Sequence, residues 1–256
     1  QLTRCRIISR FGIGVDNVDL AAATAAGIVV TKVPDYCIDE VADHSLALLL
    51  ALVRKVPFAD ARVHRGQWSM PSVVPIHRLR GTTLGLVGFG RIPQLVAPRA
   101  QAFGIQVIAA DPIVPADVMA RARVERVTFA ELVARADYVS IHAPLTPDTR
   151  NLFNAGVFAR MKPTAYLVNT ARGPLVDEAA LVEALEAGRI AGAALDVVAR
   201  EPPAADSALL SCRNLILTPH TAFYSEESLV ELQRKATEEV VRVLGGQLPL
   251  NPVNPE

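Results

Sequence analysis

The sequence predicts an α/β fold built on a parallel, doubly wound β-sheet. Short aliphatic runs alternate with longer helical segments from about residue 84 onward. The runs are apolar throughout, which is typical of strands covered on both faces. The chain has 256 residues, of which 51% are hydrophobic and 20% charged, so it can bury a large core without disulfides or metals. Strand–helix alternation of this kind requires right-handed crossovers and helices on both faces of the sheet.

The elements of this part follow from apolar runs and from apolar residues at three-to-four spacing. The predicted strands are residues 84–87, 107–110, 138–141, 165–169, 191–197 and 215–218. The predicted helices are residues 94–103, 129–136, 155–161 and 178–187. Asp177 is suited to cap the start of the last of these helices, and Gly188 to end it.

The flanking parts of the chain have a different pattern. Residues 6–9 and 28–31 are predicted strands, and residues 18–26 a helix between them. Residues 40–63 are predicted as one long helix with an apolar face. Pro71 and Pro75 make residues 68–80 an irregular linker. A last helix is predicted over residues 225–244, so the chain has two domains with a junction near residues 70–80.

Composition excludes several classes of protein. The 26 basic and 26 acidic residues cancel, so the chain lacks the basic excess of a dedicated nucleic-acid binder. The longest apolar run has eight residues, far short of the ~20 that span a bilayer. Cys5, Cys37 and Cys212 are too few and too scattered for a disulfide framework or a zinc ribbon. We therefore expect free thiols in a reducing cytoplasm and no membrane or nucleic-acid partner.

The first residue is Gln1 rather than Met, and a strand-like segment begins almost at once. We expect the natural protein to carry further N-terminal residues.

The sharpest local motif is a strand that ends in Gly88-Phe89-Gly90 and leads into a helix. Gly88 permits a tight turn, and Gly90 lets a pyrophosphate approach the backbone. The N-terminus of the following helix offers N–H groups and a positive dipole end. Pro93 replaces the third glycine of the usual pattern, and proline is tolerated in a first helical turn. The motif favours dinucleotide binding over a plain strand–helix turn.

Asp111 ends the next strand, 23 residues after Gly88. A carboxylate there can accept hydrogen bonds from an adenosine ribose and repel a 2′-phosphate, which favours NAD over NADP. Pro112, and no arginine, follows it directly. The alternative is that Asp111 caps a loop.

Three further polar residues follow later strands. Arg172, Glu201 and His220 come after the strands ending near residues 169, 197 and 218. Parallel strands bring such residues to one sheet edge, where ligands of doubly wound folds bind. Arginine can grip the carboxylate of a 2-oxo acid, and histidine can exchange a proton with the reacting oxygen. Glutamate can orient the imidazole and favour its protonated form. Each residue taken singly is also compatible with a structural role.

Several segments together resemble the D-isomer-specific 2-hydroxyacid dehydrogenases over essentially the whole chain. They are NTARGPLVDEAAL at residues 169–181, ALDV at 194–197 with Glu201-Pro202, TPHTA at 218–222 and GIGVDNVD at 12–19. The resemblance implies a Rossmann-type NAD domain inserted in a smaller, flavodoxin-like substrate domain that is N-terminally truncated here. The implied domains are residues 1–76 (partial substrate domain and hinge), 77–222 (NAD-binding) and 223–256 (a helix returning to the substrate domain).

The resemblance also implies roles for individual residues. Arg172 would bind the substrate, His220 would be the acid/base and Glu201 its partner. The backbone of Phe11, Gly12 and Ile13 would also face the substrate. Contacts to the cofactor are implied for Gly88, Gly90, Arg91, Ile92, Asp111, Pro144, Thr149, Thr170, Ala171, Asp196 (to the nicotinamide carboxamide) and Ala222. Residues 68–80 would form a hinge and part of a dimer-forming arm, so a homodimer is expected.

These implications point to a cytoplasmic NAD-dependent oxidoreductase acting on a small D-2-hydroxy acid or its 2-oxo partner. Dehydrogenases of the 3-phosphoglycerate, glyoxylate/hydroxypyruvate and D-lactate types all fit, and the sequence does not choose among them. The alternative is a non-catalytic NAD(H)-sensing scaffold like the C-terminal-binding-protein corepressors, whose pattern resembles HTAFYSE at residues 220–226.

Other candidates have simpler explanations. Glu40 and His44 are four residues apart on a helix, but no third metal ligand is in view, so a helix-surface pair is expected and no metal. Asp16, Asn17 and Asp19 are expected to form a turn and a helix cap rather than a calcium loop. His142 follows a strand and is expected to be structural or to line the cofactor.

Overall fold

A computed structural model describes residues 4–254 of the chain. They divide into two units: residues 4–40 with 223–254, and residues 41–222.

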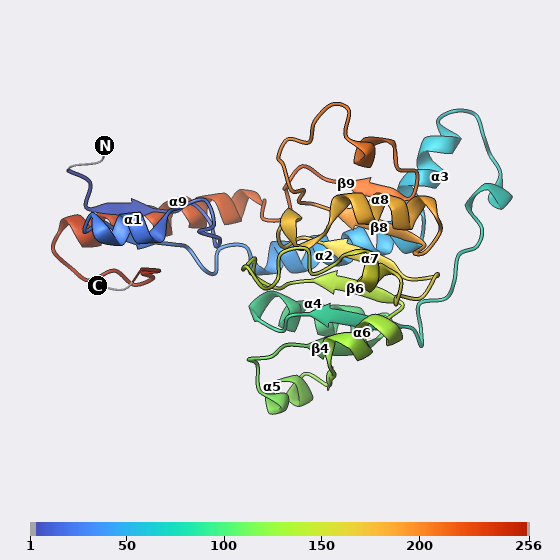
Figure 1. Ribbon diagram of the computed structural model, residues 1–256, viewed down its shortest axis with the longest axis horizontal. Helices are drawn as coiled ribbons and strands as arrows, with labels where there is room; N and C mark the ends of the chain where they lie inside the picture. Colours follow the sequence, from blue (N-terminus) through green and yellow to red (C-terminus); the bar gives the residue numbers. More distant parts are fainter. Residues whose placement is uncertain (1–3, 255–256) are drawn as a thin grey trace. The chain divides into compact units, whose positions relative to one another are not determined.

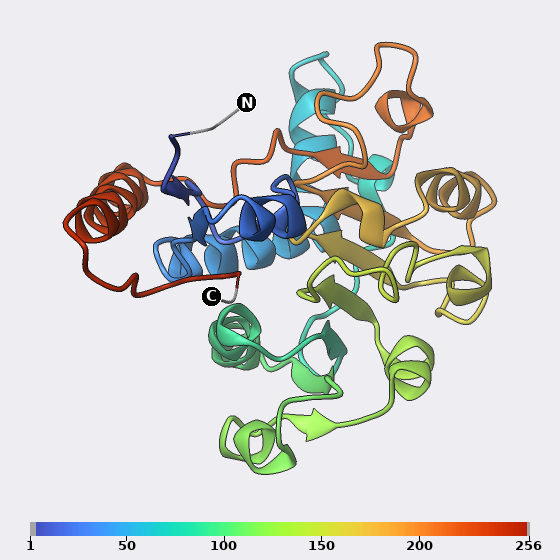
Figure 2. The same ribbon diagram turned by 60° about the vertical axis from the view of Figure 1, so that its left-hand side comes forward.

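The larger unit is built on a seven-stranded sheet in which every pairing is parallel. The strands are β3 (Thr83–Val87), β4 (Gln106–Ala110), β5 (Glu125–Arg126), β6 (Tyr138–Ile141), β7 (Tyr166–Asn169), β8 (Gly192–Leu195) and β9 (Leu215–Leu217). Their order is β5-β4-β3-β6-β7-β8-β9, and it runs in Figure 2 from green β5 at one edge to orange β9 at the other. The order reverses at β3, which confirms the predicted doubly wound sheet and places a ligand crevice at its carboxyl edge.

Helices cover both faces of this sheet (Figure 1). Leu84 and Leu86 of β3 pack with α2 (Ile38–Val53) and α4 (Arg91–Ala102) in one buried cluster. Val87 packs in a second cluster with α6 (Phe129–Arg135), α7 (Ala155–Phe158) and α8 (Glu178–Glu186). Successive residues of a strand face opposite sides, so an all-apolar strand fills both clusters.

The predicted helix over residues 40–63 is wrong, because the structure has two helices there. α2 ends at Val53, and α3 (Val56–Val63) follows. Lys55 between them has a left-handed φ of 55°, a conformation that interrupts an α-helix, and Pro57 lies in the first turn of the new one.

The compact units also differ from the expected domain boundary near residue 76. Leu49 and Leu52 of α2 are buried against the sheet beside Leu84 and Leu86. α2 therefore belongs to the larger unit from residue 41 onward. The segment predicted to be irregular contains one 3₁₀ turn, η1 (Met70–Val73).

One α-helix and one β-strand of the larger unit are absent from the sequence prediction. They are α5 (Ala116–Arg121) and the edge strand β5. The two-residue β5 is too short for a periodicity signal, and six-residue α5 follows Pro115 without a side-chain cap.

The smaller unit contains β1 (Ile7–Ser9) and β2 (Val29–Thr31) as a parallel pair, with α1 (Leu20–Ala25) between them in sequence. Asp19 caps α1 by accepting the Ala22 N–H at 2.9 Å, which confirms the predicted turn and cap. The long helix α9 (Glu226–Leu244) joins β1 through Ser9 Oγ, which donates to the Ala236 carbonyl at 2.9 Å.

Within residues 4–254, no helix is both long and apolar enough to cross a bilayer.

Candidate active site

His220 lies just beyond β9 and has an unusual backbone conformation. Its φ is 53°, a left-handed value that costs a non-glycine residue about 1 kcal/mol or more. The His220 N–H donates to the Asp196 carbonyl at 2.8 Å and to the Thr218 carbonyl at 3.0 Å. A strained, over-determined backbone of this kind is typical of functional positions.

Asp196, at the end of β8, organises the loop that carries His220. Its Oδ1 accepts the Thr218 hydroxyl at 2.6 Å and the Thr221 N–H at 2.9 Å, and its Oδ2 accepts the Ala222 N–H at 2.9 Å. Burial alone would raise the pKa of Asp196, but these bonds and one from His44 outweigh it and lower the pKa to about 2. The carboxylate is therefore ionised, and it clamps the loop on both sides of His220.

The side chain of Asp196 has no exposed surface. The expected contact of Asp196 with the nicotinamide carboxamide therefore stays a prediction, and the structure shows a positioning role for this residue in addition.

Glu201 and His220 are brought together as predicted in sequence. Glu201 Oε2 lies 2.7 Å from His220 Nδ1, while Oε1 accepts the Val198 N–H at 3.2 Å. Both side chains are about two-fifths exposed, so the pair faces solvent and can be reached by a ligand. Glu178, at the start of α8, accepts the Ala199 N–H at 2.5 Å and so helps to fix the same loop.

Arg172 follows β7 on a loop shaped by the fully buried Asn169. The Asn169 side chain accepts the Ala171 N–H at 3.0 Å and donates to the Arg172 carbonyl at 2.8 Å. The next residue is Gly173, where a Cβ would overlap the Val198 carbonyl. This close approach holds the Arg172 loop against the segment that leads to Glu201.

The glycine motif has the geometry of a phosphate site. Gly88 has a φ of 92°, and a Cβ there would meet the His142 carbonyl at 2.9 Å. Gly90 is the N-cap of the twelve-residue α4, and a Cβ built on it would meet nothing within 4 Å in the described part of the chain. The α4 N-terminus thus opens onto space at the switch point of the sheet, which fits a pyrophosphate.

Asp111 follows β4 and contacts the glycine motif directly. Its Oδ2 accepts the Phe89 N–H at 2.8 Å, and its Oδ1 accepts the N–H groups of Ile113 and Val114 at 2.8 and 2.9 Å. Burial would raise the pKa of Asp111, but the three N–H groups and nearby Arg126 lower it, so the carboxylate is ionised. The structure therefore shows the loop-capping role of Asp111, and its contact with a ribose stays a prediction.

The remaining predicted cofactor residues all lie in the larger unit, near the same edge. Arg91 and Ile92 form the first turn of α4. Thr149 Oγ1 donates to the Pro144 carbonyl at 2.7 Å in the loop after β6. Thr170, Ala171 and Ala222 lie in the loops described above, and Thr170 Oγ1 is 2.7 Å from Ser45 Oγ of α2.

The predicted substrate loop lies in the smaller unit, directly after β1. Gly12 has a φ of 141°, donates its N–H to the Arg10 carbonyl at 3.0 Å and accepts the Val33 N–H at 3.1 Å. Phe11 is half exposed. The role of Phe11, Gly12 and Ile13 stays a prediction.

His44 is a site residue that sequence reasoning missed. It was expected on a helix surface with Glu40, but its Nε2 lies 3.1 Å from Thr218 Oγ1 and 3.5 Å from Asp196 Oδ1. Because the Thr218 hydroxyl gives its proton to Asp196, His44 Nε2 is the donor to Thr218. Glu40 instead accepts the Ser225 hydroxyl at 2.7 Å. Among residues 4–254, no three potential ligands form a metal site.

His142, which was expected to be structural or to line the cofactor, forms a hydrogen bond with a residue of the preceding strand, β6. Its Nε2 lies 2.9 Å from Ser140 Oγ, and burial lowers the pKa of His142 to about 3. It is therefore neutral beside Gly88.

Comparison with known proteins places the chain in one family. Residues 46–222 match the D-isomer specific 2-hydroxyacid dehydrogenase, NAD binding domain. The D-3-phosphoglycerate dehydrogenase of Methanocaldococcus jannaschii is 44% identical over 252 residues, which are 98% of this chain and 48% of that protein. The glyoxylate reductase of Korarchaeum cryptofilum is 40% identical over 99% of this chain and 77% of its own length.

Among solved structures, D-lactate dehydrogenase from Aquifex aeolicus complexed with NAD and lactic acid has a TM-score of 0.91 and 32% identity. The match covers 99% of this chain and 81% of that one. The chain spans about half the length of the phosphoglycerate dehydrogenases that it matches.

Proposed function

Because the chain belongs to the D-isomer specific 2-hydroxyacid dehydrogenase family, we propose that it is an NAD-dependent oxidoreductase for a small D-2-hydroxy acid or its 2-oxo partner. The observation that carries the proposal is the 2.7 Å contact between His220 and Glu201 at the carboxyl edge of the sheet. Arg172 leaves the same edge, from β7. The Gly88–Gly90 motif follows β3 at this edge, so a nucleotide and a substrate can meet there.

The residues present fit NAD. The α4 N-terminus and Gly90 offer a pyrophosphate site, and Asp111 offers a carboxylate oxygen for a ribose hydroxyl. When bound, NAD(H) supplies or takes up the hydride.

The proton has a defined path through His220. Nδ1 donates to Glu201, which assigns the proton exchanged with the substrate oxygen to Nε2. In reduction of the 2-oxo acid a protonated His220 donates from Nε2, and in oxidation a neutral His220 accepts there. The negative charge of Glu201 stabilises the protonated ring and holds its orientation.

Arg172 is assigned to the substrate carboxylate. A guanidinium presents paired N–H donors that match a carboxylate and the neighbouring carbonyl oxygen. A contact of a substrate with the backbone of Phe11, Gly12 and Ile13 is also part of the proposal. The relatives are named for phosphoglycerate, glyoxylate and lactate. We therefore propose only the substrate class, small D-2-hydroxy acids, and no single substrate.

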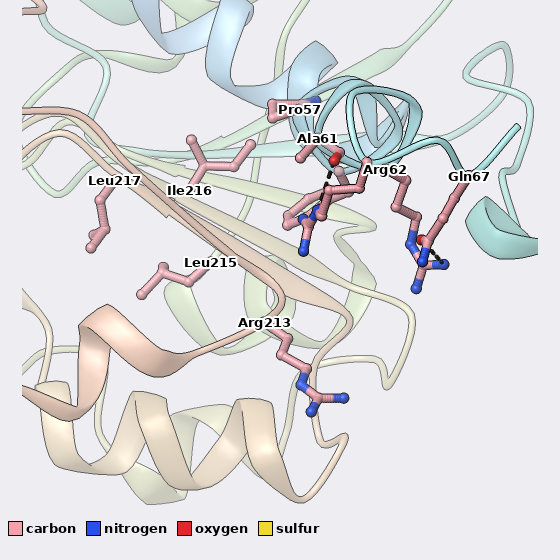
Figure 3. A pocket seen from close by; sticks show the side chains of 10 residues that line it. Pro57, Ala61, Arg62, Gln67, Arg213, Leu215, Ile216 and Leu217 are labelled. Carbon is pink, nitrogen blue, oxygen red and sulfur yellow. Dashed lines mark hydrogen bonds between the residues drawn. The ribbon is translucent and has the colours of Figure 1, made fainter.

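A homodimer is also proposed, with the β9 edge of the larger unit as the contact face. A groove of about 720 Å³ lies between α3 and β9, with Leu215, Ile216 and Leu217 on one side (Figure 3). In the arm that follows α3, residues 68–80, Trp68 is 89% exposed and Met70 is 71% exposed. An edge strand, a groove that combines aliphatic side chains with Arg62, Arg65 and Arg213, and an exposed apolar arm together suit a contact with a second copy. Trp68→Glu should then lower the mass measured by light scattering, whereas Ile113→Glu, at an equally exposed position near β5, should not.

The free thiols of Cys5, Cys37 and Cys212 fit the proposed cytoplasmic location, where reducing conditions keep cysteines unpaired.

A turnover assay separates the enzyme from the corepressor-like scaffold. The full chain is mixed with NADH and, in turn, glyoxylate, hydroxypyruvate, pyruvate and 3-phosphohydroxypyruvate, and loss of NADH is followed by absorbance. We expect turnover with at least one of these acids. NADH binding without turnover on any 2-oxo acid would favour the scaffold.

A further inference from the structure

Arg126 lies beside Asp111 although fifteen residues separate them in sequence. Arg126 is on β5, in register with Ala109 of the neighbouring strand β4. Its Nη2 donates to the Asp111 carbonyl at 3.3 Å, and its side chain is exposed. The sequence motif placed Pro112, and no arginine, next to Asp111. The sheet pairing supplies the arginine instead.

The Asp111 carboxylate has limited capacity for a ribose. Each carboxylate oxygen can accept about two hydrogen bonds. Oδ1 already accepts two backbone N–H groups, from Ile113 and Val114, and Oδ2 accepts one, from Phe89. Oδ2 therefore retains one acceptor position for a ribose hydroxyl.

Glu125, the acidic residue next to Arg126 in sequence, pairs with a different arginine. Neighbouring residues of a strand point to opposite faces. Glu125 is engaged by Arg135, with two N–O distances of 2.7 and 2.8 Å. The Asp111 carbonyl takes one of the five N–H donors of the Arg126 guanidinium.

We propose that Arg126 is a specificity-determining residue at the adenosine end of the NAD site, where it favours a nucleotide with a 2′-phosphate. The inference rests on the proposed NAD site. Asp111 repels a 2′-phosphate and Arg126 attracts it, so the balance between two adjacent opposite charges sets the preference for NAD(H) over NADP(H). Removing the charge of Asp111 alone leaves a guanidinium ready to bind the phosphate, as in NADP-binding folds of this kind.

Binding of half-cofactors tests this without any turnover. Calorimetry on the full chain measures the dissociation constants of 5′-AMP and of 2′-phospho-5′-AMP. The variants are Asp111→Asn, Arg126→Gln and the double variant. Arg121→Gln is the matched control, because Arg121 is an exposed arginine on nearby α5 that pairs with Asp117 instead.

The unmutated chain should bind 5′-AMP more tightly, and Asp111→Asn should reverse the preference. Arg126→Gln should weaken 2′-phospho-5′-AMP about 10- to 100-fold in the Asp111→Asn background, the effect of losing a charge-assisted hydrogen bond. In the unmutated chain, Arg126→Gln should likewise raise the dissociation constant of 2′-phospho-5′-AMP relative to that of 5′-AMP. It should leave 5′-AMP within about twofold, and Arg121→Gln should change neither nucleotide.

Equal effects of Arg126→Gln on both nucleotides, or none on either, would overturn the role of Arg126 while leaving the nucleotide site in place. A chain that binds neither nucleotide would overturn both the site and this inference. Nucleotide binding by Arg126→Gln is also measured without the Asp111 substitution. The test therefore remains possible even if Asp111→Asn fails to fold.

Discussion

Replacing Asp196 with Asn should both destabilise the larger unit and disorder the His220 loop. The carboxylate accepts the Thr218 hydroxyl and the N–H groups of Thr221 and Ala222 at 2.6–2.9 Å. An amide offers one oxygen, so its NH₂ group must face at least one of these buried donors. Losing charge assistance and leaving a buried donor unsatisfied should lower the free energy of unfolding by about 3 kcal/mol at pH 7.

The pH dependence gives an independent measure of the same interaction. The pKa of Asp196 is lowered from 3.8 to about 2 in the folded chain, which corresponds to about 2 kcal/mol. Because the folded pKa is the lower one, this stabilisation is complete above about pH 4 and is lost as the pH falls through about 2. The Asn variant lacks this dependence, so its deficit should shrink by about 1 kcal/mol at pH 3.

Urea unfolding followed by circular dichroism, at pH 7 and pH 3 without cofactor, measures both effects. Asp117→Asn is the control, because Asp117 is an exposed partner of Arg121 and its loss should cost less than about 1 kcal/mol. An Asp196→Asn deficit below about 1 kcal/mol at pH 7, or one equal at both pH values, would refute the clamp.

Three further predictions concern the catalytic loops. Arg172→Lys should lower kcat/KM for 2-oxo acid reduction roughly 30- to 1,000-fold, since an ammonium cannot reproduce the fork, with NADH binding measured by fluorescence unchanged; near-normal kinetics would remove Arg172 from the site. Gly173→Ala should lower kcat/KM and thermal stability together, because its Cβ would overlap the Val198 carbonyl; a melting temperature equal to that of the unmutated chain would contradict this close approach. Glu201→Gln replaces the carboxylate that accepts from His220 Nδ1 with a neutral amide, so kcat/KM for reduction should fall about 10-fold or more while NADH binding is unchanged. An unchanged kcat/KM would make Glu201 merely structural.

The sheet was predictable because its strands are buried on both faces. Continuous apolar runs such as residues 84–87 can be recognised without knowing their neighbours. β5 could not be found in this way, because its two residues are polar and owe their strand geometry to pairing with β4. The break between α2 and α3 depends on the left-handed conformation of Lys55, which lysine propensity does not indicate.

The candidate site was partly predictable for the same reason. Residues in the loops that follow strands, such as Glu201 after β8 and His220 after β9, reach a common edge by topology. His44 and Arg126 belong to elements that pack beside those edges, and no fixed spacing links them to Asp196 or Asp111. Their contacts depend on tertiary packing, so only the structure reveals them.

The most direct test of the central claim is kcat/KM for NADH-dependent reduction of the best 2-oxo acid, compared between the unmutated chain and His220→Ala. We expect a loss of about 10²- to 10⁴-fold at every pH, because the general acid is gone, with the dissociation constant of NADH unchanged. His64→Ala, at an 80% exposed surface histidine, should have no effect. A His220→Ala variant that reduces the 2-oxo acid at the unmutated rate would contradict the assignment of His220 as the proton donor, and with it the mechanism built on the Glu201–His220 pair.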